Sequence, residues 1–326
     1  MACLSLLLTT GAVGVILAAP VIPYLVKRIG ALALVLLAVS LVVFALLRLI
    51  PGDPAALMAG VDAQPQEVAR LRQLLALDRP VAVQYLSFLT RAFSGDLGRS
   101  LRSHQPVAQD LLPRFGASLY LALVSLGLAL VVGVPAGVLA ALRRGSLWDS
   151  ALMGLSVLGV SMPTFWLALI LIGFFSVRLG WLPTSGFEGA QYVILPGLTL
   201  AAFSLATIAR TARAALIEVL DQDYVRTARA KGLAERLVTG KHALRNALIP
   251  LVAVVGLQFG YLLGSSVVTE TVFSWPGLGW LLVDAIKNRD LPVVQGVVLV
   301  FTAAFAIINL AVELLYAVLD PRIRQP

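Results

Sequence analysis

Residues 119–142 read LYLALVSLGLALVVGVPAGVLAAL, a run of 24 residues without a charged side chain. A hydrocarbon layer about 30 Å thick needs about 20 apolar residues of helix, because each residue advances about 1.5 Å. Water is absent from that layer, so the backbone amides must bond within the segment itself. The run therefore predicts a membrane-spanning α-helix.

The composition of the whole chain agrees with this prediction. Of its 326 residues, 59% belong to the apolar set and 13% are charged, whereas soluble domains average about 45–50% and about 25%. Too few charges remain to cover a water-exposed surface. A soluble enzyme is therefore excluded, and so is a nucleic-acid binder, despite the net charge of +8.

Similar apolar runs recur along the chain and predict an all-α integral membrane protein with a six-helix core over residues 27–326. The expected spans are about 29–49, 117–142, 150–177, 190–215, 246–269 and 291–318. Residues 1–26 form an extra apolar N-terminal segment, which Pro20 and Pro23 interrupt. It is interpreted as a membrane-embedded or interfacial helix, or as an idle extension from an upstream start. The lack of a basic n-region disfavours a cleaved signal peptide.

Positive charge predicts the orientation. If Lys27 and Arg28 face the cytoplasm, 14 of the 25 Lys and Arg residues lie on that side, against six acidic residues. Cytoplasmic loops carry such an excess. Both ends of the six-helix core are therefore expected inside, and the loop 51–116 outside.

The outer loop carries helix signals of its own. Pro65 and Pro80 each precede apolar residues spaced at three and four, which predicts two short amphipathic helices. A third short helix is expected after Pro106. The outer tryptophans expected in the aromatic belt at the headgroup level are Trp181, Trp275 and Trp280.

Residues 218–245, which we name the elbow, read EVLDQDYVRTARAKGLAERLVTGKHALR and form the long hydrophilic stretch on the inner side. Asp223 can cap a first helix, Gly232 can end it in a left-handed turn, and Leu233 starts a second helix. The small residues Ala228 and Gly232 would let another protein's backbone approach closely. A basic loop resting on anionic lipid is the alternative, and spacing alone leaves both open.

Two stretches of the elbow region resemble a known family. DYVRTARAKG (223–232) and HALRNALIP (242–250) are similar to the signature loop of permease subunits of ATP-binding-cassette (ABC) importers, in its dipeptide, oligopeptide and nickel version. Supporting similarities are LLRLIPGDPA (46–55), LDRPVAVQYLSFL (77–89), GDLGRS (95–100), LGWLPTSG (179–186), TETVFSWPGLGWLL (269–282) and LDPRIR (319–324). The resemblance covers the chain beyond about its first 23 residues.

The resemblance implies that the elbow is a cytoplasmic coupling helix, which docks in a groove on a separate ATPase subunit. The residues it assigns to this contact are Arg226, Thr227, Ala228, Lys231, Gly232, Leu233 and Leu244. Arg226 and Thr227 stand where the generic importer signature has Glu and Ala, and His242, Leu244 and Arg245 stand where it has Ile, Leu and Pro. These departures follow the peptide-permease branch, and contacts of the generic glutamate cannot be carried over.

The resemblance also implies the partners and the location. It predicts a homologous second permease, two ATP-binding subunits, an extracytoplasmic substrate-binding protein and surrounding lipid, in a prokaryotic plasma membrane. Lys241 is followed by His242 instead of the Ser or Thr of a phosphate-binding loop. The chain is therefore expected to be no enzyme and to bind no cofactor, with ATP and Mg held by the ATPase subunits.

Several residues inside the expected spans are candidates for helix packing or for the substrate path. Gly256, Gly260 and Gly264 form a small-xxx-small repeat, which suits either close helix packing or a path for peptide backbone. The polar candidates on the fifth and sixth spans are Gln258, Asn309 and Glu313. Asn309 and Glu313 share one helical face, and an intramembrane carboxylate is costly unless it is paired or hydrated.

The predicted function is import of short peptides by alternating access, with nickel or glutathione as alternative substrates of the same architecture. Other classes fit less well. A proton-coupled secondary transporter needs a relay of membrane carboxylates, and Glu313 stands almost alone. Cys3, His104 and His242 are too few and too scattered for a zinc site or for an intramembrane hydrolase.

Overall fold

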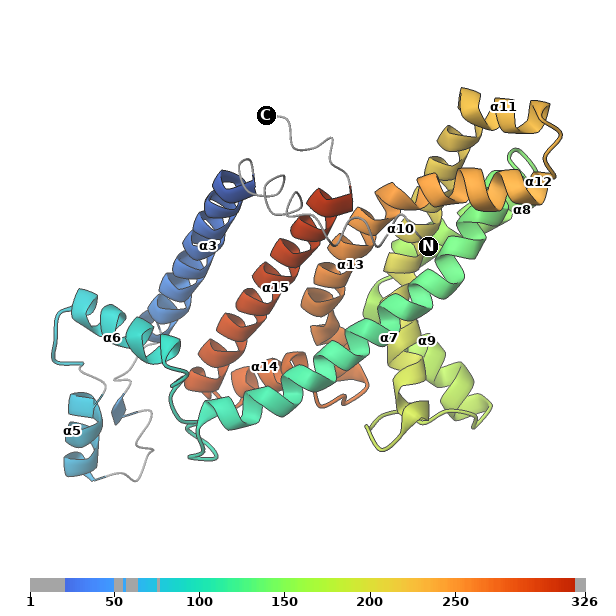
Figure 1. Ribbon diagram of the computed structural model, residues 1–326. Helices are drawn as coiled ribbons and strands as arrows, with labels where there is room; N and C mark the ends of the chain where they lie inside the picture. The colour runs from blue at the N-terminus through green and yellow to red at the C-terminus, as the bar shows by residue number, and fades with distance from the viewer. Residues whose placement is uncertain (1–20, 50–54, 57–63, 75–76, 320–326) are drawn as a thin grey trace.

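The computed structural model describes residues 21–49, 55–56, 64–74 and 77–319, so most of the apolar N-terminal segment lies outside the described residues (Figure 1). The described part is built from helices. They are α3 (Val21–Leu49), α5 (Pro65–Leu74), α6 (Val81–Phe93), α7 (Val107–Leu142), α8 (Leu147–Ser161), α9 (Thr164–Leu171), η1 (Ile172–Arg178), η2 (Ala190–Val193), α10 (Ile194–Leu220), α11 (Asp223–Ala230), α12 (Glu235–Leu237), η3 (Val238–Ala243), α13 (Leu244–Val272), α14 (Leu278–Lys287) and α15 (Leu291–Leu319).

Five of the described helical segments are long and apolar enough to cross a membrane, and one bent pair makes a sixth span if it is counted as one. The span predicted over 150–177 is not one continuous helix. α8 and the α9–η1 segment meet at 107°. Pro163 explains the bend, because proline pushes the preceding residue out of the helical region, and Met162 accordingly has ψ 129°.

Two helix starts also differ from expectation. α3 begins at Val21, with Pro23 in its first turn, where the missing N–H costs nothing. The helix expected after Pro106 is not separate but forms the first turns of α7, which continues through Pro113. The amphipathic helices predicted after Pro65 and Pro80 are confirmed as α5 and α6.

α7 and α10 make the most extensive helix contact in the described part, and glycines set their separation. A Cβ atom on Gly137 would lie 2.3 Å from the Ala209 carbonyl oxygen, and one on Gly133 would lie 2.9 Å from that of Leu205. Side chains at these positions would drive the helices apart. Small residues serve this purpose in membranes, where lipid is as apolar as the helix surface.

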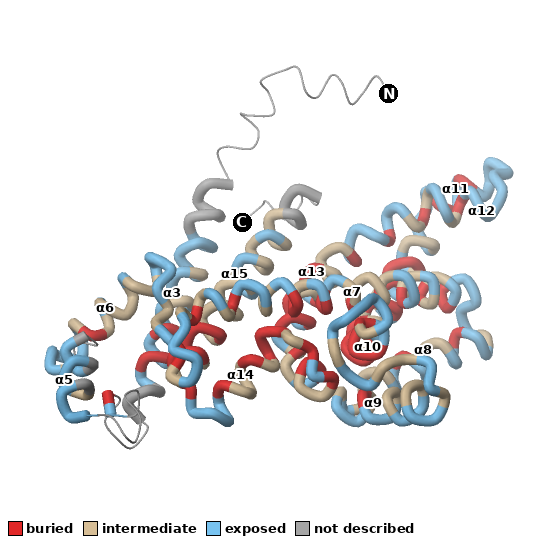
Figure 2. The backbone as a smooth tube through the Cα atoms, turned by 90° about the horizontal axis from the view of Figure 1, so that it is seen from below, coloured by how far each residue is buried: buried red, intermediate tan, exposed pale blue. Residues whose placement is uncertain are grey.

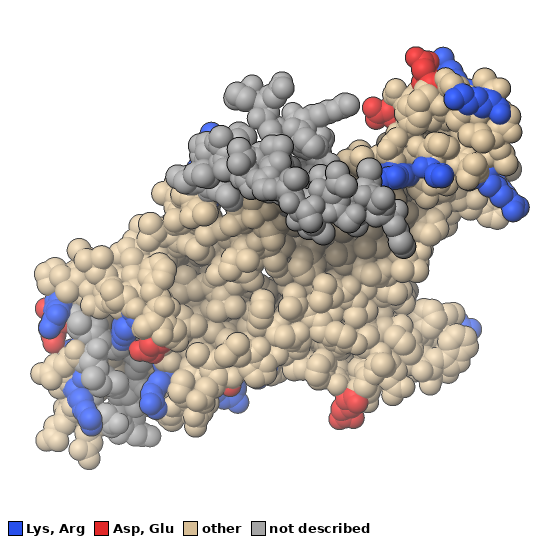
Figure 3. Space-filling view, viewed as in Figure 1, with Lys and Arg blue, Asp and Glu red and all other residues tan. Residues whose placement is uncertain are grey.

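Burial and charge follow the pattern of a membrane protein. Buried residues concentrate where α7, α10, α13 and α14 meet, whereas α3 exposes large apolar side chains (Figure 2). On the face drawn in Figure 3, the described charged side chains lie at the upper right, at the lower left and along the lower edge, and they leave an uncharged band across the middle. An apolar band of this kind suits contact with lipid.

Candidate functional site

The elbow folds as two helical arms around a glycine. The first arm is α11, which ends at Ala230, and Gly232 follows with φ +75°. This φ lies in the left-handed region, which residues with a Cβ atom rarely adopt. The Gly232 N–H donates a hydrogen bond to the Arg229 carbonyl at 2.9 Å. The predicted left-handed turn is confirmed.

The first arm starts differently from the prediction. Gln222 is the N-cap residue of α11, and its side chain makes no capping hydrogen bond. Asp223, the predicted cap, is instead the first helical residue, where its negative charge favours the positive end of the helix dipole. The capping role assigned to Asp223 is therefore wrong.

The elbow has a small apolar core of its own. Val225, Ala228 and Val238 are buried together, and Val219 and Leu220 at the end of α10 pack against them. Ala228 is only 8% exposed. In this chain it faces the inside of the elbow, so the expectation that Ala228 offers a close-approach surface to another protein is wrong.

Polar contacts fix the two arms relative to each other. Arg229 Nη2 donates to Glu235 Oε1 at 2.7 Å across the turn, and this bond raises the pKa of the Arg229 guanidinium. At the base of the elbow, Asn246 Nδ2 donates to the Tyr224 hydroxyl at 2.8 Å. The two arms are therefore held together by an apolar core and by polar contacts.

The outer surface of the elbow carries most of the predicted coupling residues. The exposed ones are Arg226, Thr227, Lys231, Gly232 and Leu233, and Leu244 is half-buried. Tyr224 and Leu237 are exposed apolar side chains on the same elbow. The surface thus mixes cationic and apolar groups, as protein-docking surfaces do.

The second arm is continuous with a membrane span, which the sequence did not indicate. α12 passes through the π-helical segment η3 into α13, so that helix runs from Glu235 to Val272. At about 1.5 Å per residue, its 38 residues reach about 57 Å. Figure 1 shows the elbow at one end of this helix and α14 at the other. A displacement of the elbow therefore acts directly on a transmembrane helix.

The glycine repeat on α13 divides into two kinds of position. A Cβ atom on Gly256 would lie 2.1 Å from Val312 Cγ1, and one on Gly260 would lie 3.1 Å from the Phe305 ring, both on α15. A Cβ atom on Gly264 would meet nothing within 4 Å. Gly256 and Gly260 therefore serve packing between α13 and α15, and Gly264 faces open space in this chain.

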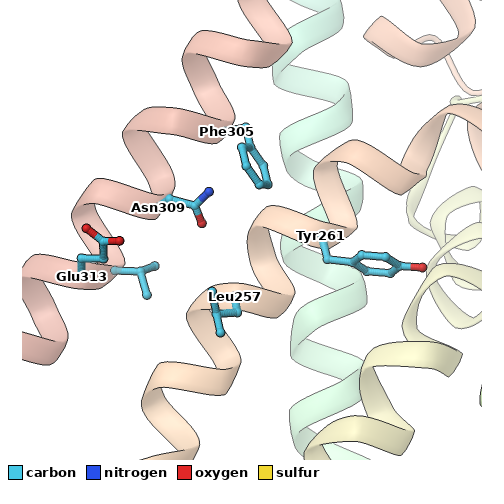
Figure 4. A pocket seen from close by; sticks show the side chains of 6 residues that line it. Leu257, Tyr261, Phe305, Asn309 and Glu313 are labelled. Atoms are coloured by element: carbon cyan, nitrogen blue, oxygen red, sulfur yellow. The ribbon is translucent and has the colours of Figure 1, made fainter. Parts of the chain in front are cut away.

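A hollow of about 360 Å³ lies between α13 and α15 (Figure 4). Its lining residues are Leu257, Tyr261, Phe305, Asn309, Val312 and Glu313. Asn309 and Glu313 thus line one hollow, as their shared face predicts. Gln258 is buried and is not among the lining residues. In the described part of the chain, no three His, Cys, Asp or Glu side chains gather as a possible metal site.

Reasoning from the sequence missed the surroundings of three carboxylates. Glu313 pairs with Arg28 of α3 at 2.7 Å. Asp149 of α8 accepts two hydrogen bonds from Arg213 of α10, at 2.6 and 2.7 Å. Glu270 near the end of α13 is fully buried. A carboxylate beside or within an apolar run was the available signal, because it requires partners there.

The three tryptophans predicted for the outer end do not all belong to an aromatic belt. Trp181 is exposed, but Trp275 is 1% exposed and its Nε1–H donates to the Ala117 carbonyl at 3.0 Å. The belt assignment of Trp275 is wrong, since its ring packs inside the protein with Tyr120 and Phe187.

Curated relatives match over almost their whole length. The glutathione transport system permease protein GsiC of Escherichia coli O6:H1 is 48% identical over 301 residues, which cover 92% of this chain and 98% of that protein. The GsiC proteins of Escherichia coli K12 and Salmonella choleraesuis are 47% identical with the same coverage.

Solved structures give the same fold. An inward-facing structure of the MetNI methionine ABC transporter, from a selenomethionine-soaked crystal form, superposes with a TM-score of 0.55 at 22% identity. The match covers 63% of this chain and 94% of that chain. The native crystal form gives a TM-score of 0.53 at 23% identity, covering 64% and 96%. At this identity the likeness establishes the fold alone.

Two family profiles complete the comparison. The profile described as "Binding-protein-dependent transport system inner membrane component" matches residues 133–325, and its N-terminal companion matches residues 21–122. Together with the relatives, they confirm the resemblance drawn from the elbow sequence. The chain belongs to the family of binding-protein-dependent transport system inner membrane components, and it is a permease subunit of an ABC importer of the peptide/nickel subfamily.

Proposed function

We propose that this permease imports short peptides, with glutathione as the first candidate, by alternating access. The proposal of glutathione rests on the GsiC relatives, which are named for glutathione transport and align over 98% of their length. Glutathione is itself a tripeptide, so it falls within the short-peptide class. Free dipeptides and nickel remain the competing substrates for the experiment below.

The observation that carries the mechanism is the continuity of the elbow with α13. We place the exposed residues Arg226, Thr227, Lys231, Gly232 and Leu233 in contact with an ATPase subunit, with Leu244 at the base of the contact. ATP and Mg are bound by that subunit, and this chain contributes no cofactor site. When the ATPase closes, the elbow moves and α13 moves with it.

The complex contains ATPase subunits and a partner permease, as the family requires. We further propose that the partner is a homologous but different permease, that two ATPases bind inside, and that an extracytoplasmic protein delivers substrate. The hollow lined by Asn309 and Glu313 is placed beside the substrate path, because polar groups at this depth avoid lipid.

Transport assays on the assembled complex test the substrate. The chain is reconstituted into liposomes with its partner permease, ATPases and binding protein, and uptake of labelled glutathione, a dipeptide and nickel is compared. ATP-dependent uptake of glutathione above the other two supports the proposal. Uptake of nickel alone would overturn the peptide assignment, and equal uptake by a complex lacking the second permease would overturn the heteromeric one.

Labelling of introduced cysteines tests the orientation. In a Cys3→Ser background, Ser103→Cys lies in the outer loop and Leu147→Cys at the opposite end, where Leu147 is 89% exposed. An impermeant thiol reagent applied to intact cells should label position 103 and not position 147. The reverse pattern would place the elbow outside and refute its contact with an ATPase.

A further inference from the structure

The N-terminus of α14 is capped by two other helices. The Leu278 N–H donates to Ser118 Oγ of α7 at 2.8 Å, and the Gly279 and Trp280 N–H groups donate to Glu270 Oε2 of α13 at 2.7 and 3.1 Å. Ser118 Oγ in turn donates to Glu270 Oε1 at 2.7 Å. Glu270 and Ser118 are both fully buried. The first free N–H groups of α14 are thus satisfied from α7 and α13.

The local sequence cannot supply this cap. The N-cap residue is Gly277, which has no side chain to accept a hydrogen bond. A Cβ atom on Gly277 would lie 2.3 Å from Glu270 Oε2, and one on Gly279 would lie 2.5 Å from Val267 Cα. Both glycines therefore make room for the carboxylate and for α13. The negative charge also complements the positive end of the α14 dipole.

The other end of α14 is tied to the outer loop. Asp290, which follows α14 and is 4% exposed, accepts hydrogen bonds from Ser100 Oγ and from the Leu101 N–H. Arg102 of the same loop lies 3.5 Å from Asp284 of α14. α14 therefore bridges the end of α13 and the outer segment around residues 100–102.

We propose that Glu270 is a positioning residue that fastens α14 to α13, so that α14 and the outer loop move with α13 when the elbow moves. The proposal rests on the coupling role proposed above for the elbow. Three links make up the connection: the continuous helix from Glu235 to Val272, the Glu270 cap, and the Asp290 tie. Through it, a binding protein docked outside and an ATPase docked inside act on the same helix.

The test uses the whole complex in nanodiscs, with ATPase activity measured with and without the substrate-loaded binding protein. Glu270→Gln keeps the side-chain volume but removes the charge, and Glu270→Ala removes every hydrogen bond. Lys287→Gln, which also removes one charge from α14 but at an exposed position, is the control. We expect basal activity within about twofold of wild type in all three. Stimulation by the binding protein should be retained in Lys287→Gln, reduced in Glu270→Gln and lost in Glu270→Ala.

A distance measurement separates transmission from simple folding. Spin labels at Val268→Cys on α13 and Ile286→Cys on α14, both exposed, report whether the two helices move as one body. The distance should be equal in the nucleotide-free and vanadate-trapped states of the wild-type sequence, and should change between the states in Glu270→Gln. If Glu270→Ala does not assemble, Glu270→Gln alone decides.

The outcomes of these experiments are distinct for the two proposals. Absence of stimulation in the wild-type complex contradicts the coupling function itself. Wild-type stimulation that persists fully in the Glu270 variants, or a wild-type distance that changes between states, overturns only the role of Glu270. Loss of basal activity together with stimulation in Glu270→Gln would also overturn it, because that pattern indicates a general structural defect.

Discussion

The turn at Gly232 allows a substitution whose cost comes from the backbone alone. Its φ is +75°, and a Cβ atom built there meets nothing within 4 Å. Gly232→Ala therefore creates no clash, and the expected penalty is that of a left-handed conformation, about 1–2 kcal/mol. Such a penalty lowers the population of the native elbow relative to other turn geometries by about 5- to 30-fold.

The elbow also contains a matched control for this substitution. Gly240 lies in η3, has no positive φ, and likewise has nothing within 4 Å of its Cβ position. Gly240→Ala adds the same methyl group without the backbone penalty and should behave as wild type. Gly232→Asn should fall between glycine and alanine, because asparagine tolerates the left-handed region better than other residues with a Cβ atom.

The assay is ATPase activity stimulated by substrate-loaded binding protein, normalised to the amount of assembled complex. Membrane abundance should stay near wild type, because the spans pack independently of this turn. Stimulated activity should fall in the order Gly232, Gly232→Asn, Gly232→Ala, with Gly240→Ala unaffected. Full activity of Gly232→Ala, or equal losses in the two alanine variants, would refute the argument that turn geometry positions the elbow.

Three further predictions concern the membrane part. Glu313→Arg should lower the membrane abundance of the permease, because it places two cations together. The double variant Arg28→Glu/Glu313→Arg should restore the abundance, which is measured by fluorescence of a fused reporter. Asp149→Asn should lower the melting temperature of the purified complex, because it leaves the guanidinium on α10 without its carboxylate; an unchanged melting temperature would contradict this. Gly256→Ala should cost about 1–3 kcal/mol through overpacking against α15, whereas Gly264→Ala should be tolerated, and equal melting temperatures would count against the packing role.

The helical type of the spans, and the positions of five of them, could be predicted from sequence for a physical reason. A segment surrounded by lipid must satisfy its backbone internally, so apolar length alone specifies a helix. The turn at Gly232 was predictable for a similarly local reason, since glycine between two helical patterns signals a left-handed cap. The bend at Pro163 carried a local signal too, which the unbroken apolar run 150–177 obscured.

The remaining features depend on contacts between distant segments. Ala228 belongs to the core of the elbow because Val238 of the second arm returns over it, and its small size alone gave the opposite interpretation. Glu270 and Ser118 are 152 residues apart in sequence. The meaning of the glycines at 277 and 279 emerges only when the carboxylate that they accommodate is in place.

The polar contacts also indicate where the permease can move. Lipid does not favour helix association by the hydrophobic effect, so polar links and close glycine contacts determine which helices stay together. Arg28 joins α3 to α15 through Glu313, Asp149 joins α8 to α10, and Glu270 joins α14 to α13. A link of this kind is costly to break where the remaining partner is left uncompensated in a low-dielectric site, as for the fully buried Glu270.

The contact between α13 and α15 is of another kind. It relies on van der Waals packing at Gly256 and Gly260, and the hollow between the two helices is lined by Asn309 and Glu313. Helices in van der Waals contact can shift past each other, whereas helices joined by a charged contact must first break that contact. We therefore expect the parts of α13 and α15 that line the hollow to shift relative to each other during transport, which opens or closes the hollow between them.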